Sequence, residues 1–159
     1  MEWRAEYSVG IEEIDKQHQE LLRLFSCVEE AVVTNQGWSA IHYSLVEVRQ
    51  FTEFHFKFEE ALMRLYGYSG SAAHAEAHRQ ILGDVVEIEQ ASVRTDAKEG
   101  LLAFYRHWLI THIQGADRAY AEHILNGGKV VVPIEFHPNS DTGTKCNQVS
   151  VFLATAMPS

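Results

Sequence analysis

Histidine and carboxylate side chains recur at helical intervals in the middle of this 159-residue chain. In the stretch "HFKFEEALMRLYGYSGSAAHAEAH", residues 55–78, His55 and Glu59 lie four positions apart, and so do His74 and His78. Side chains four positions apart lie on the same face of an α-helix. Imidazole nitrogens and carboxylate oxygens are ligands that divalent transition metals accept. The spacing therefore suggests that these four side chains face one metal site inside a helical protein.

The elements that must position these residues are predicted by four blocks of apolar side chains. Apolar residues recur every three or four positions over about 11–34, 38–66, 69 or 71 to 93, and 95 or 96 to 125, and no alternating strand pattern occurs before residue 129. The blocks end at "NQG" (35–37), Gly67 and "NGG" (126–128), which favour helix termination. Connections this short force neighbouring helices to run antiparallel. The sequence predicts an all-α fold, an antiparallel up-down-up-down four-helix bundle.

Each predicted helix carries a possible metal ligand within its apolar stripe. A single pair is weak support, because nine histidines in 159 residues give about 0.5 pairs at this spacing by chance. At a rise of about 1.5 Å per residue, most of these side chains fall roughly 5–16 Å from the same end of the bundle, and His112 falls at about 21 Å. Their coincidence on all four helices predicts one shared site. The candidates are His18 in the first helix, His55 and Glu59 in the second, His74 and His78 in the third, and His112 and Asp117 in the fourth.

A dinuclear metal site explains why so many polar side chains would point inward. Burying charged groups without partners costs on the order of several kcal/mol each, so something must neutralise them. Five imidazoles and two carboxylates exceed the needs of one tetrahedral zinc ion. Two cations about 3.5–4 Å apart can share bridging carboxylates. Mixed nitrogen and oxygen donors suit iron, and a manganese or zinc pair is also compatible with these ligand types.

One interval departs from the helical spacing. Asp117 follows His112 by five positions, which corresponds to a rotation of about 140° around an ideal helix. Either the helix is locally distorted between these residues, or their side chains reach the metals from opposite flanks of the stripe. Gly115 makes both arrangements easier.

Composition restricts the class of partner. The net charge is −9, which argues against binding to nucleic acid or to an anionic membrane surface, since both need clustered Lys and Arg. The longest apolar run, residues 149–157, is too short to span a bilayer, and the N-terminus has no signal-peptide pattern. Two distant cysteines, Cys27 and Cys146, do not indicate a disulfide framework. We expect a cytoplasmic protein with no membrane or nucleic-acid partner.

The last part of the chain differs in character from the rest. Residues 129–159 have few charges, three prolines and two short β-branched runs. We therefore expect a bundle domain over residues 1–128 and a C-terminal appendage over residues 129–159. The appendage could be a hairpin on the bundle, a contact for a protein partner or for self-association, or a mobile tail.

Four motifs taken together resemble those of the bacterial hemerythrins. They are "VGIEEIDKQHQEL" with His18, "HFKFE" with His55 and Glu59, "HAEAH" with His74 and His78, and "HWLITHIQGADRAY" with His112 and Asp117. The resemblance covers roughly residues 3–126 and implies a non-haem di-iron site that binds O2 reversibly. It implies that His74, His78 and His112 hold one iron, that His18 and His55 hold the other, and that Glu59 and Asp117 bridge the two. An oxo or hydroxo group would be the third bridge, leaving the second iron five-coordinate and open to O2.

The resemblance favours a binding protein for oxygen storage, delivery or buffering over an enzyme. A histidine-rich iron pair stabilises high-valent iron less than a carboxylate-rich pair does. Leu109 and Trp108, three and four positions before His112, are expected over the open side, where the family places a leucine as a gate against water. Tyr120 is either a hydrogen-bond donor to the site or a core residue. Two other functions stay open: an O2 or redox sensor read by a partner protein, and a redox enzyme that handles NO or peroxide.

Overall fold

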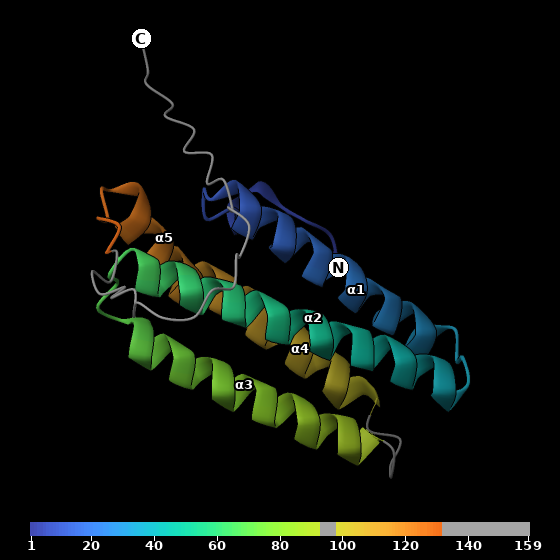
Figure 1. Ribbon diagram of the computed structural model, residues 1–159. Helices are drawn as coiled ribbons and strands as arrows, with labels where there is room; N and C mark the ends of the chain where they lie inside the picture. The colour runs from blue at the N-terminus through green and yellow to red at the C-terminus, as the bar shows by residue number, and fades with distance from the viewer. Residues whose placement is uncertain (93–97, 132–159) are drawn as a thin grey trace, which may run out of the picture.

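The computed structural model describes residues 1–92 and 98–131, and these residues form helices joined by short turns (Figure 1). The predicted start of the fourth helix at Thr95 or Asp96 and residues 132–159 of the predicted appendage lie outside this description. The elements are a short 3-10 turn η1 (Ala5–Tyr7), α1 (Glu12–Val33), α2 (Trp38–Leu65), α3 (Ser71–Ser92), α4 (Lys98–His112), a π-helical turn η2 (Ile113–Asp117) and α5 (Arg118–Leu125).

The helices form the predicted bundle. α1 packs against α2, α2 against α3, α3 against α4, and α4 against α1, which closes the ring. Successive helices run in opposite directions, and α4, η2 and α5 together make the fourth member (Figure 1). The all-α four-helix bundle predicted from the apolar periodicity is confirmed.

The turns after α1 and α2 reverse the chain with left-handed backbone conformations. Asn35 has φ +50° after α1, and the N–H of Gln36 donates to the carbonyl of Ala31 at 2.9 Å. Gly67 has φ +62° after α2, and a Cβ there would lie 2.8 Å from a methyl carbon of Val131. Such C-terminal caps satisfy the last carbonyls of a helix and end it sharply. The short reversals keep neighbouring helices antiparallel.

The entry into α1 is fixed by a carboxylate one turn before His18. Asp15 accepts hydrogen bonds from the backbone N–H of Val9 at 2.8 Å and from the hydroxyl of Ser8. A carboxylate near a helix N-terminus is also favoured by the helix dipole. This contact ties the N-terminal segment to the first turn of α1 and sets the height at which His18 enters the bundle.

Apolar side chains from all four members of the bundle make one core. The core includes Ile14 and Leu21 of α1, Leu45 and Met63 of α2, Val85 of α3, Tyr105 and Leu109 of α4, and Tyr120 of α5. None of the helices within residues 1–92 and 98–131 has the length and apolar character needed to cross a lipid bilayer.

Removing side-chain volume from this core should destabilise the bundle. Leu45 is fully buried, so Leu45→Ala should lower the free energy of unfolding by about 2–5 kcal/mol through lost burial and a residual cavity. Val33 is 78% exposed, so Val33→Ala should change it by less than about 0.5 kcal/mol. Urea denaturation followed by circular dichroism measures both. Equal effects of the two substitutions would contradict the packing described.

Candidate metal centre

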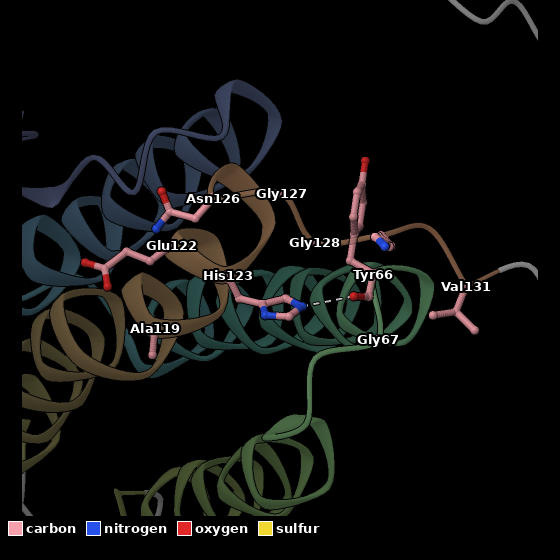
Figure 2. Close-up of a pocket in the computed structure, with 10 residues that line it drawn as sticks. Tyr66, Gly67, Ala119, Glu122, His123, Asn126, Gly127, Gly128 and Val131 are labelled. Carbon is pink, nitrogen blue, oxygen red and sulfur yellow. Dashed lines mark hydrogen bonds between the residues drawn. The ribbon is translucent and has the colours of Figure 1, made fainter.

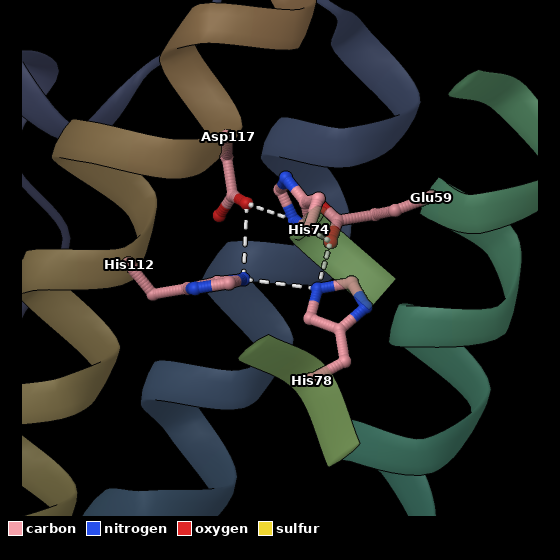
Figure 3. Close-up of side chains that lie close together, drawn as sticks. All are labelled: Glu59, His74, His78, His112 and Asp117. Carbon is pink, nitrogen blue, oxygen red and sulfur yellow. Dashed lines mark hydrogen bonds and ion pairs between the residues drawn. The ribbon is translucent and has the colours of Figure 1, made fainter. Parts of the chain in front are cut away.

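The bundle brings all seven sequence-predicted side chains together in its interior. Each is between 0% and 7% exposed. His18 comes from α1, His55 and Glu59 from α2, His74 and His78 from α3, His112 from the end of α4, and Asp117 from the end of η2. Figure 3 shows five of them pointing toward one another from three sides. The helical rise placed His112 further from the end of the bundle than the other six side chains. In the structure its Nε2 atom nevertheless lies 3.0 Å from Nε2 of His78.

The seven side chains divide into two overlapping groups. One group consists of His74, His78 and His112 with the two carboxylates, and the other of His18 and His55 with the same two carboxylates. Within each group the potential ligand atoms lie within 4.8 Å of one another. Glu59 and Asp117 are the shared members. Such an arrangement can surround two cations that lie side by side.

Glu59 directs one carboxylate oxygen at each group. Its Oε1 atom lies 3.5 Å from Nε2 of His55 and 3.9 Å from Nε2 of His18. Its Oε2 atom lies 3.2 Å from Nε2 of His78 and 3.6 Å from Nε2 of His74. The carboxylate therefore lies between the two groups with an oxygen on either side.

Asp117 repeats this arrangement from the opposite helix. Its Oδ2 atom lies 3.3 Å from Nε2 of His18, in the second group. Its Oδ1 atom lies 3.3 Å from Nε2 of His74 and 3.2 Å from Nε2 of His112, in the first group (Figure 3). Both carboxylates thus have the orientation of a ligand that bridges two metal ions.

The π-helical turn η2 explains how residues five apart can serve the same site. A π-helix closes its hydrogen bonds over five residues, so the interval from His112 to Asp117 matches one of its turns. Of the two arrangements that the sequence left open, the structure shows local distortion of the helix. A Cβ at Gly115 would meet no atom within 4 Å, so this glycine is not required for space. Its contribution is the low helix propensity of glycine, which weakens the regular α-helical alternative.

Several buried atoms of the site have no hydrogen-bond partner among the described residues. They are both ring nitrogens of His18, Oε2 of Glu59, Nε2 of His74 and both carboxylate oxygens of Asp117. Buried polar atoms are normally satisfied, and leaving them unpaired costs about 1–3 kcal/mol each. Most of these atoms face the space between the two groups, where a cation would satisfy them. The donor set therefore fits bound metal, and five imidazoles with two carboxylates suit iron.

Two polar side chains outside the seven hold imidazole rings by their outer nitrogens. Oε1 of Gln17 lies 3.0 Å from Nδ1 of His55, and Oε1 of Glu60 lies 3.2 Å from Nδ1 of His78. An acceptor at Nδ1 keeps the proton there and leaves Nε2 free to bind metal. Sequence reasoning missed both residues. The only signal was their position next to His18 and Glu59, which does not distinguish them from other polar neighbours.

Tyr120 also contacts the site. Its hydroxyl donates a hydrogen bond of 2.7 Å to Oε1 of Glu59, and both side chains are fully buried. The sequence left open whether Tyr120 contacts the site or only packs in the core. The structure shows both, because the ring is part of the core and the hydroxyl fixes the orientation of the carboxylate.

The pKa values of two site histidines move in opposite directions in the metal-free protein. Burial lowers the pKa of His55 to about 4, although Glu59 partly offsets this effect. Burial also acts on His74, but the nearby carboxylates of Asp117 and Glu59 outweigh it and raise the pKa to about 9. The imidazoles around Glu59 overcome its burial and hold its pKa well below the ordinary value. Without metal, the carboxylates therefore stay charged and a proton on His74 neutralises part of that charge.

Apolar side chains cover the centre on the α4 side. The ring of Phe56 stacks on that of His78 with centroids 3.7 Å apart, and Trp108 lies edge-on to Phe56. Leu109 is buried one turn before His112. Trp108 also lies edge-on to the ring of His112, in the first histidine group, and the O2 pocket expected at Leu109 and Trp108 stays a prediction.

Of the histidines outside the motifs, the three that the structure describes, His42, His107 and His123, take part in neither group. His42 lies 3.6 Å from Glu89, and Nε2 of His123 lies 3.0 Å from the carbonyl of Tyr66. A surface pocket of about 700 Å³ surrounds His123 at one end of the bundle, and its lining includes none of the seven side chains (Figure 2). His107 lines another surface pocket, and His137 lies outside the described residues.

Comparison with known proteins agrees with this geometry. Residues 9–124, which contain all seven side chains, match the family model described as the hemerythrin HHE cation binding domain. The chain is 32% identical to a bacteriohemerythrin of Stenotrophomonas maltophilia over 77% of this chain and 80% of that protein. It is 29% identical to a hemerythrin-like protein of Naegleria gruberi over 74% and 88% of the two chains, and 26% identical to a bacteriohemerythrin of Methylococcus capsulatus over 76% and 93%. The chain therefore belongs to the hemerythrin family of cation-binding domains.

Proposed function

We propose that this protein binds O2 reversibly at a non-haem di-iron centre and so stores, delivers or buffers oxygen. The observation that supports this most directly is the orientation of Glu59 and Asp117, each of which directs one oxygen at each histidine group. Membership of the hemerythrin family supports it independently. The cytoplasmic location expected from the sequence stays a prediction.

The ligand assignment follows the two groups. We assign His74, His78 and His112 to one iron, His18 and His55 to the other, and Glu59 and Asp117 to both. Two buried carboxylates with neutral imidazoles leave negative charge that a pair of divalent cations would compensate. When bound, a pair of ferrous ions supplies two electrons that O2 can take up and return.

The asymmetry between the groups indicates where the gas would bind. The first group offers five donor residues and the second offers four. An external ligand is therefore expected on the side of His18 and His55, where the protein supplies one donor fewer. Tyr120 would hold Glu59 in its bridging orientation through the 2.7 Å hydrogen bond.

The surroundings favour binding over oxidation chemistry. The buried rings of Phe56 and Trp108 lie against His78 and His112, and the buried Leu109 lies one turn before His112. Water and protons that reach bound oxygen promote its irreversible loss, so a dry wall preserves reversibility. A redox enzyme would need a route for polar substrates, and the wall on the α4 side offers apolar surface instead.

Metal analysis combined with visible spectroscopy tests the proposed function. The purified protein loaded with ferrous iron should contain two irons per chain and should show an absorption band that appears with O2 and disappears when O2 is removed, over repeated cycles. Glu59→Ala removes one of the two carboxylates that the groups share, so the iron content of this variant should fall below two per chain.

Glu53→Ala is the matched control for this experiment. Glu53 lies on the same helix and pairs with Arg49 at the surface, so its loss should leave two irons and the reversible band. Full iron retention in Glu59→Ala would contradict the bridging role. A wild-type chain that binds two irons but shows no reversible response to O2 would contradict the O2-binding function itself.

Leu109 should limit the oxidation of the oxygenated protein. Leu109→Ala opens the apolar wall to water, so the O2-dependent absorption should decay severalfold faster than in the wild type. Leu102→Ala, which removes a buried leucine two turns further from His112, should not accelerate the decay. If both variants decay at the wild-type rate, Leu109 is not a gate.

The metal-free protein should be most stable near pH 6.5. His55 has a folded pKa of about 4, below its ordinary value of 6.5, so the stability it contributes is present above pH 6.5 and lost as the pH falls toward 4. His74 has a folded pKa of about 9, so its contribution is present below pH 6.5 and lost as the pH rises toward 9. Urea denaturation of chelator-treated protein across this range measures both limbs. His74→Gln should remove the loss of unfolding free energy above pH 6.5 and retain the loss below it. An unchanged loss above pH 6.5 would refute the assignment to His74.

A further inference from the structure

Helix α2 has a second apolar face beside the one that lines the core. Its inner face carries Leu45, His55 and Glu59, and α2 lies between α1 and α3 with α4 on its inner side (Figure 1). Its outer face is unusually apolar for a solvent-facing helix, with Tyr43 72% exposed and Phe54 53% exposed. Contiguous exposed apolar surface marks an interaction site more often than isolated residues do. The outer face consists of the exposed Tyr43, Phe54, Ala61 and Leu65 together with Phe51 and Phe58, which are half-buried and also pack against the core.

The spacing of this face is that of a helix-packing seam. Phe51, Phe54, Phe58, Ala61 and Leu65 follow one another at intervals of three, four, three and four residues. This alternation is the heptad pattern by which one helix packs along another. The rings of Phe51, Phe54 and Phe58 also contact one another along the helix, with centroid distances of 5.8 and 6.4 Å. The face is therefore preformed as a continuous aromatic strip.

We propose that this face binds the same face of a second copy of the chain, so that two α2 helices pack antiparallel about a twofold axis near residue 52. In such a pair each residue lies opposite the one that is equally far from residue 52 on the other side. The contact is isologous, so both copies contribute the same residues.

Charge complementarity identifies the second copy as the occupant. Two exposed charged side chains of α2, Glu47 and Lys57, flank the outer face and lie five residues on either side of Thr52. Neither forms a salt bridge within residues 1–92 and 98–131, although the charge of Glu47 acts on Arg23. The antiparallel register places Glu47 of each copy opposite Lys57 of the other. The two charges also cancel, so two chains of net charge −9 can meet at this face without repulsion from the face itself.

A groove beside Phe54 provides the matching concave surface. It has a volume of about 400 Å³ and lies between α1 and α2. Its lining residues are Glu20, Arg23 and Leu24 of α1 with Glu47, Gln50, Phe51 and Phe54 of α2. In the proposed register, Phe54 of one copy lies opposite Gln50 of the other and enters this groove. Arg23 forms its two hydrogen bonds with Glu20 and attracts Glu47 only at longer range, so the Glu47 carboxylate can pair with the second copy.

Sedimentation equilibrium of the full chain tests the pairing. The wild type should be a dimer in the micromolar range. Phe54→Glu places a charge in the centre of the face and should raise the dissociation constant by about tenfold or more. Val86→Glu is the control, because Val86 is an exposed apolar residue of α3 outside this face, and it should leave the dissociation constant unchanged. Circular dichroism checks that both variants are folded.

Charge reversal tests the register. Glu47→Lys alone and Lys57→Glu alone should each weaken self-association, because like charges then face each other twice. An equimolar mixture of the two variants should restore the dimer as a heterodimer, since both facing pairs are again opposite in charge. A wild type that stays monomeric, or a mixture that associates no better than its components, overturns the proposal. Neither outcome depends on iron or O2, so the self-association and the proposed O2 binding are tested independently of each other.

Discussion

Two buried carboxylates surrounded by five imidazoles impose the constraint on which the rest of this structure depends. A charged carboxylate in a protein interior requires compensation from several directions, and no single helix can provide it. Every member of the bundle therefore brings a nitrogen donor to the same level, and the antiparallel topology lets sequence-distant segments do so. Gln17, Glu60 and Tyr120 then fix the rings and the Glu59 carboxylate from outside, which limits how far the centre can rearrange.

The same constraint sets a competition between protons and cations. Because Asp117 and Glu59 hold a proton on His74, any metal that binds through Nε2 of this ring must displace it. His55 is the opposite case, since burial keeps its ring neutral and ready to bind. Metal loading is therefore coupled to pH mainly through one side of the centre.

The sequence predicted most of the centre because its chemistry coincides with helical periodicity. His55 with Glu59 and His74 with His78 repeat every four residues, and each predicted helix had to contribute to one interior, so their convergence follows from spacing and topology alone. The geometry between His112 and Asp117 could not be predicted in this way, since a five-residue spacing is compatible both with a distorted helix and with side chains that reach the metals from opposite flanks. Gln17 and Glu60 were missed because their roles depend on side-chain reach across helices, which no spacing along the chain encodes. The second face of α2 was also missed, because a core stripe and an outer stripe on one helix look like uniform hydrophobicity until burial is known.

The π-helical turn has a consequence for how the fourth helix can vary. It accommodates one extra residue, so that α4 and α5 keep a common inward face although His112 and Asp117 are five positions apart. Deleting one residue between 113 and 116 would leave His112 and Asp117 four positions apart, a spacing that a regular α-helix already places on one face. The fourth helix thus carries the apolar wall before η2 and the second carboxylate at its end, and one additional residue between them is compatible with a single shared interior.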